Sequence, residues 1–164
     1  MGTVTSSQPT DRSKSIEELE GIAWAPPSLS SYIARTTFAL RRKPLRDLTN
    51  EDVRVGLEQH AGINYLVPLA IERLENDPLV ESRLYPGDLL QSLLDVPFDY
   101  WSVRPDMQRE TARIATAGLD QAKACSASWQ AEILPGIREA HDRFTGKLKS
   151  RVWLRPDEGK APPL

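Results

Sequence analysis

The chain has little of what most enzymes and secreted proteins depend on. Its 164 residues include one cysteine, Cys125, and two histidines, His60 and His141. A single cysteine excludes an intramolecular disulfide, and neither histidine stands at a metal-ligand spacing from Cys125. The sequence also lacks the glycine-rich patterns of nucleotide sites, the Gly-x-Ser-x-Gly elbow and the Cys-x-x-Cys pair. We therefore expect no catalytic residues, no metal site and no cofactor.

Long hydrophobic runs are also absent. No stretch of about 18 apolar residues occurs, and the N-terminus lacks the apolar segment of a secretory signal. A net charge of −2 gives no general attraction to polyanions, which argues against a dedicated nucleic-acid binder. Together with the lone cysteine, these features predict a cytoplasmic protein that contacts neither membrane nor nucleic acid.

No run of alternating apolar and polar residues predicts a β-strand, so the fold class depends on helical periodicity. The strongest helical pattern predicts a helix from about Asn64 to Asn76, interrupted near its start by Pro68. Its apolar positions recur at intervals of three and four and define one face that must be buried: Ile63, Leu66, Val67, Ala70, Ile71 and Leu74.

Six further helices follow from apolar spacing and from residues that begin and end helices. Their predicted ranges are 16–20, 28–43, 49–60, 88–94, 105–125 and 135–149, with an earlier start for the last helix if Ile133 extends its apolar stripe. We therefore predict an all-α protein, with a single compact multi-helix domain over residues 15–154. Residues 1–14 are polar and without periodicity, which predicts a disordered arm, and residues 155–164 are proline-rich and predict a frayed tail.

Several residues predict particular helix ends. Thr49 is expected to cap the helix that follows it, and Gly62 to end that helix in a left-handed conformation. Residues 85–88 predict a type II turn. Asp88 and Gln91 have the spacing of a capping box, in which each side chain satisfies a backbone amide at the start of the next helix.

Charge is unevenly distributed along the chain. From Glu72 to Trp101 there are seven acidic and two basic residues, whereas Arg35–Arg46 contains five bases and no acid. The acidic segment is either an ordinary solvated surface or a face that selects a basic partner. Its aromatic residues either close the core or anchor that partner. The candidate partner-binding residues are Glu72, Glu75, Asp77, Glu81, Tyr85, Asp95, Asp99, Tyr100 and Trp101.

Three blocks of the sequence resemble a known family in their order and spacing. They are LRRKPLRDLTNEDVR at residues 40–54, YLVPLAIERL at residues 65–74 followed by Asp77-Pro78-Leu79, and YPGDLL at residues 85–90. This pattern is similar to the immunity proteins of bacterial contact-dependent growth inhibition (CDI) systems, the CdiI family. The resemblance covers residues 38–101.

The resemblance implies a non-catalytic cytoplasmic protein that binds and neutralises the C-terminal toxin domain of a cognate CDI effector. A basic toxin, of which a nuclease is one example, would suit the acidic segment. The alternative is a helical nucleic-acid-binding regulator that places Arg35–Arg46 against phosphates, which steeply salt-dependent DNA binding would reveal.

Overall fold

The computed structural model describes residues 9–28 and 31–152, with side chains as far as Gly146. In this part of the chain there are eight α-helices, one 3₁₀ turn and no strand, which confirms the all-α prediction. The elements are α1 (Ile16–Glu20), α2 (Tyr32–Leu40), η1 (Leu45–Asp47), α3 (Asn50–Glu58), α4 (Ile63–Asn76), α5 (Asp88–Leu94), α6 (Phe98–Ser102), α7 (Pro105–Ala124) and α8 (Ala127–Val152).

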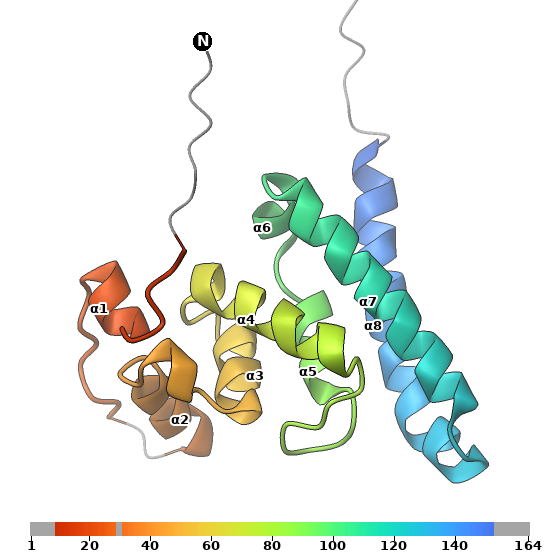
Figure 1. Cartoon of the computed structure of the whole chain (residues 1–164), viewed down its shortest axis with the longest axis horizontal. Helices are drawn as coiled ribbons and strands as arrows, with labels where there is room; N and C mark the ends of the chain where they lie inside the picture. The colour runs from red at the N-terminus through yellow and green to blue at the C-terminus, as the bar shows by residue number, and fades with distance from the viewer. Residues whose placement is uncertain (1–8, 29–30, 153–164) are drawn as a thin grey trace, which may run out of the picture.

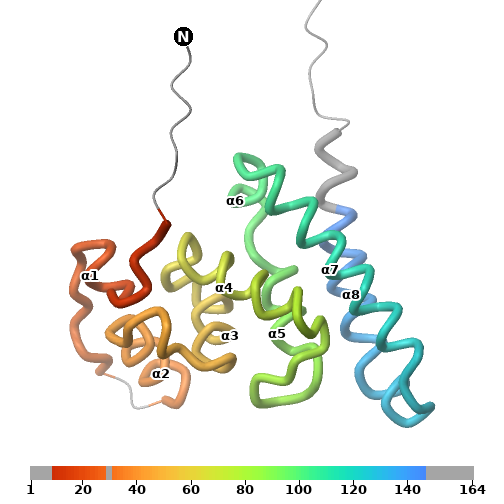
Figure 2. The backbone as a smooth tube through the Cα atoms, viewed as in Figure 1, coloured from red at the N-terminus to blue at the C-terminus, as the bar shows by residue number. Residues whose placement is uncertain are grey.

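The helices form a row of three groups (Figure 1). The short helices α1 and α2 lie at one end, α3, α4 and α5 occupy the middle, and α7 and α8 form a long hairpin at the other end. The backbone trace shows α8 returning along α7 in the opposite direction (Figure 2). Helix α5 packs against both α3 and α8, so it joins the middle of the molecule to the hairpin.

Helix α4 carries the predicted buried face. Five of its six predicted positions are buried, and Ile63 at the first turn is half-buried. Pro68 lies inside the helix, where it cannot donate to the carbonyl of Asn64. Burial of the apolar stripe outweighs that missing hydrogen bond.

The joint between α3 and α4 differs from the prediction. Helix α3 ends at Glu58, and His60, with φ of 52°, is the left-handed residue that follows it. Gly62, with φ of 89°, instead precedes α4 as its N-cap. A Cβ at Gly62 would lie 2.8 Å from the side chain of Ile16, so glycine is needed there for conformation and for the close approach of α1.

Two helix starts were predicted wrongly. Helix α2 begins at Tyr32, because the Ser31 side chain accepts the amide of Ala34 and so caps the helix. Helix α8 begins at Ala127 and carries Pro135 in its interior. Ile133, two residues before the proline, is 1% exposed, and its burial offsets part of the cost of about 3 kcal/mol that an interior proline carries.

Residues just before α1, assigned to the arm from sequence, contact the domain. The carbonyls of Arg12 and Lys14 accept the amides of Arg46 and Leu45 at 3.1 and 3.0 Å. The Arg12 guanidinium also pairs with the carboxylate of Glu72 on α4. Most of the predicted arm and the predicted tail, residues 1–8 and 155–164, lies outside the described residues.

Candidate partner-binding surfaces

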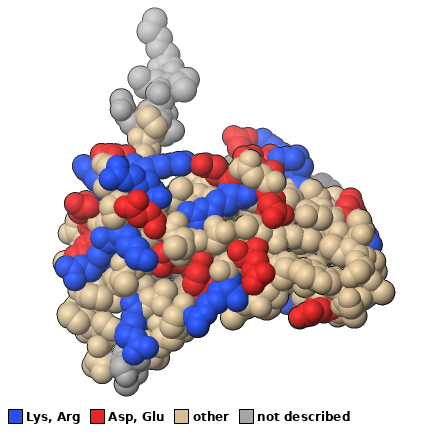
Figure 3. Space-filling view, turned by 60° about the horizontal axis from the view of Figure 1, so that its bottom comes forward, with Lys and Arg blue, Asp and Glu red and all other residues tan. Residues whose placement is uncertain are grey.

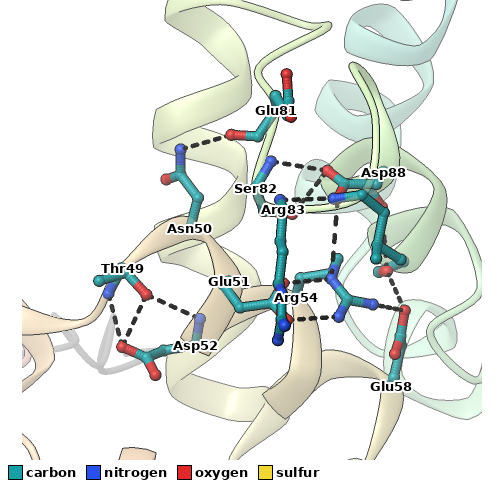
Figure 4. A network of polar contacts seen from close by, with 12 residues as sticks. Thr49, Asn50, Glu51, Asp52, Arg54, Glu58, Glu81, Ser82, Arg83 and Asp88 are labelled. Atoms are coloured by element: carbon teal, nitrogen blue, oxygen red, sulfur yellow. Dashed lines mark hydrogen bonds and ion pairs between the residues drawn. The ribbon is translucent and has the colours of Figure 1, made fainter.

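A buried arginine joins α3 to α5 (Figure 4). The Arg54 guanidinium donates to both oxygens of Glu51 at 2.6 and 2.8 Å and to Glu58 at 2.6 Å. The Asp88 carboxylate lies 3.9 Å from its Nε. The hydrogen bond to Glu51 is the main cause of a raised pKa for Arg54. The side chain is 5% exposed, so three carboxylates compensate a charge that water does not solvate.

Asp88 closes the loop that precedes α5. Its carboxylate accepts the amides of Ser82, Arg83 and Leu84 at 2.9, 3.2 and 3.0 Å, and the Ser82 hydroxyl at 2.6 Å. Burial alone would raise the pKa of Asp88, but these hydrogen bonds outweigh it and the pKa is lowered. The predicted capping box with Gln91 is therefore wrong, because the carboxylate turns back to the loop instead of capping α5.

The predicted turn at residues 85–88 is confirmed. The amide of Asp88 donates to the carbonyl of Tyr85 at 3.2 Å, and Gly87 has φ of 87° as a type II turn requires. This turn and the Asp88 carboxylate fix the segment between Glu81 and Asp88, which we call the Asp88 loop. Leu84 within it is 58% exposed.

A hollow of about 300 Å³ lies between α3, α5 and the Asp88 loop. Its walls include Leu57 and Glu58 from α3, Leu84 and Tyr85 from the loop, Gln91 from α5 and Asp95 just after α5. We call it the α3–α5 hollow. The Tyr85 hydroxyl donates to Gln91 at 3.3 Å, and the Ser92 hydroxyl donates to Glu58 at 3.0 Å. Its interior is thus mixed, with apolar side chains beside carboxylates.

A second hollow, of about 410 Å³, lies between α4 and α7. Pro68, Ile71 and Met107 give it apolar lining, and the acids that line it are Glu72, Glu75, Asp106 and Glu110. Each of these acids has an arginine beside it: Arg12 pairs with Glu72, Arg109 with Asp106, and Arg113 with both Glu75 and Glu110. We call it the α4–α7 hollow.

The structure distributes the nine predicted partner-binding residues over different environments. Glu72 and Glu75 line the α4–α7 hollow, whereas Tyr85 and Asp95 line the α3–α5 hollow. Asp77 accepts the amide of Leu79 at 3.1 Å and stabilises the turn after α4. Glu81 and Asp99 have exposed side chains elsewhere on the surface. The set therefore does not form one continuous patch.

Two predicted aromatic anchors belong to the core. Tyr100 and Trp101 are 9% and 1% exposed, and the Trp101 ring makes edge-to-face contacts with Tyr100 and Phe144 at centroid distances of 5.1 and 5.7 Å. The indole nitrogen of Trp101 donates to the carbonyl of Val96 at 3.1 Å. Of the two interpretations of this aromatic cluster, the one in which it closes the core describes the structure, and it leaves Trp101 inaccessible to a partner.

Bases distant in sequence lie beside the acidic segment. Arg12, Arg113 and Arg143 pair with Glu72, Glu75 and Asp95, respectively. In the space-filling view of Figure 3, acidic and basic side chains are interspersed over the left and middle of the surface, and the right-hand part is mostly uncharged. The local excess of acid in the sequence therefore does not become an uninterrupted acidic face in that view.

The basic segment Arg35–Arg46 is partly consumed by the fold. Arg41 is 1% exposed, donates to Glu20 at 2.7 Å and lies 4.1 Å from the centre of the Trp24 ring. Lys43 donates to Asp52 at 2.9 Å. With two of its five bases held in this way, the segment does not present the row of cations that the regulator alternative requires.

Arg54, Glu58 and Ser92 were not among the residues predicted from the sequence to form a site. Glu51 and Glu58 stand three residues before and four residues after Arg54, a spacing that brings all three side chains to one helix face. That spacing can be read from the sequence, but on a solvated helix such ion pairs are common and contribute little to stability. The burial of Arg54 arises because α5 covers this face, and the position of α5 could not be read from the sequence.

Two further observations concern the class of protein. Among the described residues, no group of three or more histidine, cysteine, aspartate or glutamate side chains is placed to hold a metal ion. No helix in that same part of the chain is long and apolar enough to cross a membrane. The class that the fold and its surfaces define is a small helical scaffold with hollows between its helices.

The chain belongs to the family of CDI immunity proteins. The sequence model of that family matches residues 18–111, more than half of the chain, and confirms the resemblance seen in the three sequence blocks. Membership of the family implies toxin neutralisation as the general role. The matched region contains every residue that lines the α3–α5 hollow or the α4–α7 hollow. No curated protein and no solved structure matches the chain.

Proposed function

We propose that the protein acts in the cytoplasm by binding the C-terminal toxin domain of its cognate CDI effector in a one-to-one complex. The family match carries this proposal, because immunity proteins of CDI systems neutralise toxins. The two hollows support it, since each combines apolar lining with carboxylates. That combination suits a partner that presents basic and apolar side chains together.

The proposed mode of protection is stoichiometric binding without catalysis. The buried polar groups nearest the α3–α5 hollow already have structural partners: Arg54 bonds two glutamates, and the Asp88 carboxylate accepts four hydrogen bonds from its loop. Groups fixed in this way are suited to holding a surface in shape. We propose a basic toxin domain as the partner, and a nuclease would have the positive surface that nucleic acid requires.

The interface is proposed on the segment from Glu72 to Trp101 and its neighbours in the two hollows. Substituting Lys for Glu72, Glu75, Asp77 or Glu81, one at a time, tests this placement. We expect weaker toxin binding in at least the variants that line a hollow, with thermal stability largely kept because these side chains are exposed. Association of the wild-type protein should also slow as salt rises, because salt screens attraction between exposed charges.

The direct test of the function is co-expression with the toxin domain encoded immediately upstream of this protein. A stable complex with a calorimetric stoichiometry near one supports the proposal. A second measurement follows toxin activity as the protein is added, and inhibition should be complete near one equivalent. Inactivation of excess toxin by a small fraction of an equivalent would instead indicate an enzyme, and failure to form any complex would contradict the proposal.

A further inference from the structure

We propose that the α3–α5 hollow is a socket for one basic side chain of the toxin domain. This inference rests on the proposed function and makes it more specific by naming the place and the chemistry of the central contact. At about 300 Å³ the hollow has the volume of roughly ten water molecules at about 30 Å³ each, which suits one long side chain. The hollow is therefore large enough to take one inserted side chain of the toxin.

The charges of the lining favour a cation. Three carboxylates, those of Glu58, Asp88 and Asp95, line the hollow together with two basic side chains, those of Arg54 and His60. The hydrogen bonds that the Arg54 guanidinium donates go to carboxylates, with Nε and Nη2 on Glu51 and Nη1 on Glu58. An entering group therefore meets carboxylate oxygens next to a base whose hydrogen bonds are already directed to acids.

Glu58 is the best placed acceptor. One of its oxygens, Oε1, accepts both Arg54 and the Ser92 hydroxyl, at 2.6 and 3.0 Å. The other oxygen accepts no hydrogen bond from the described residues, and the side chain is 38% exposed. Because Arg54 and Ser92 hold the carboxylate in place, a partner cation would find an acceptor whose orientation is already fixed.

Asp95 provides a second acceptor at the edge of the hollow. It pairs with Arg143 at 3.2 Å, and both side chains are more than two-fifths exposed. Exposed pairs of this kind contribute little to folding, so a partner cation can share or replace Arg143 at modest cost. Arg143 thus limits the socket on one side without closing it.

The rim has the apolar surface that an interface needs around a buried charge. Leu84 is 58% exposed although four hydrogen bonds to the Asp88 carboxylate fix its loop. An exposed leucine on a fixed loop loses little freedom when a partner covers it. Leu57 and Tyr85 continue the apolar wall inside. Covering these groups would exclude water from the contact between Glu58 and the cation and so strengthen it.

The α4–α7 hollow is less suited to the same role. Every acid in its lining already has an arginine of this chain beside it: Arg12, Arg109 or Arg113. A partner cation there would compete with three guanidinium groups. In the α3–α5 hollow the competing guanidinium groups are those of Arg54, which is fixed, and Arg143, which is at the edge, and the His60 imidazole also lines the hollow.

Two variants test the socket by different means. Glu58→Gln keeps the shape of the side chain and removes its charge. Gln91→Lys places an ammonium group of this chain in the hollow and so blocks it. We expect each variant to weaken binding of the purified toxin domain by tenfold or more, measured by calorimetry on the full-length protein. Matched controls are Glu132→Gln on α8 and Ala117→Lys on α7, whose exposed side chains lie outside the hollow and should leave affinity unchanged.

Single alanine substitutions of the basic residues of the toxin then identify the inserted side chain. One such substitution should weaken binding to the wild-type protein by tenfold or more, and should weaken binding to Glu58→Gln by much less, because the contact is already lost. Circular dichroism melting of every variant separates this effect from unfolding. If Glu58→Gln weakens folding, Gln91→Lys still tests the socket because it leaves the Arg54 contacts intact.

The outcomes separate this inference from the proposed function. Wild-type affinity in both folded socket variants, in a protein that still binds the toxin, would overturn the socket and leave the proposed function standing. The socket would also be overturned if the socket variants bind more weakly but every toxin substitution weakens binding to Glu58→Gln as much as binding to the wild type. No single cation would then be the occupant. Absence of any complex with the wild-type protein would overturn both.

Discussion

The joint between α3 and α5 and the hairpin of α7 and α8 use the same kinds of ion pair in different surroundings. At the joint, Arg54 is 5% exposed and bonds Glu51 and Glu58. Along α7, Arg113 pairs with Glu110 and Lys123 with Asp120, but both bases are more than half exposed. The comparison shows that the type of pair does not decide its importance. Burial does, because water no longer compensates a broken pair.

The largest effect is expected from breaking the pair at the joint. Arg54→Met removes the guanidinium and leaves the Glu51 and Asp88 carboxylates with little solvent. Removing one partner of a buried ion pair costs about 3–5 kcal/mol of unfolding free energy, and chemical denaturation would measure the loss. A denaturation midpoint equal to that of the wild type would mean that α5 does not cover this face of α3.

A similar or somewhat smaller effect is expected on α4, where a core side chain also lines the α4–α7 hollow. Ile71 on α4 is 9% exposed within the core. Ile71→Ala removes buried atoms and leaves a cavity, which costs about 2–5 kcal/mol. Equilibrium denaturation in urea measures this loss of unfolding free energy. The same measurement on Ala112→Gly gives the effect of a substitution on α7 for comparison. An unchanged midpoint for Ile71→Ala would show that α4 packs in another orientation.

Much of the fold could be predicted because its causes are local. The apolar stripe of α4, the Thr49 cap and the turn before α5 all follow from residues a few positions apart. The predictions were wrong where packing between distant parts of the chain decides the local structure. Pro135 lies inside α8 because Ile133 is buried by other elements, and Asp88 turns away from α5 because its loop offers four donors.

The candidate surfaces were harder to predict than the fold. Glu72 and Asp95 were identified from the acidic excess of their segment, but the arginines beside them come from positions 12 and 143, which no local pattern connects to them. Trp101 was named as a candidate anchor, although its contact with Phe144 on α8 places it in the core. Glu58 was missed because its role depends on Arg54 being covered by α5.

A moderate effect is expected from the carboxylate that closes the Asp88 loop. In Asp88→Asn the amide keeps one acceptor oxygen, but its NH₂ group would face backbone amides that are also donors. Leaving such groups unsatisfied costs about 1–3 kcal/mol. Thermal melting at neutral pH measures the loss. A matched control is Asp120→Asn on α7, whose exposed carboxylate should be dispensable.

The same carboxylate makes stability depend on pH. The pKa of Asp88 and that of Asp52 are lowered in the folded protein, from an ordinary value of 3.8. A lowered pKa means that the folded state favours the ionised form. This stabilisation is complete above the unfolded value and is lost as pH falls through the lower folded value. We expect unfolding free energies to fall below about pH 4, and to fall less steeply in Asp88→Asn.

The smallest effect is expected on the hairpin. Arg113→Ala removes a guanidinium that pairs with Glu110 and approaches Glu75 at 3.9 Å, but the side chain is 62% exposed. Water replaces both contacts, so the melting temperature should stay at the wild-type value. A loss comparable with that of Arg54→Met would contradict the distinction between the two regions.

The most direct test of the account is hydrogen–deuterium exchange of the full-length protein, free and saturated with the purified toxin domain. We expect the toxin to slow exchange in the Asp88 loop and at the end of α3, around Leu84 and Glu58, because these segments border the α3–α5 hollow. Slowed exchange confined to α7 and α8, with the Asp88 loop and the end of α3 unchanged, would contradict the account.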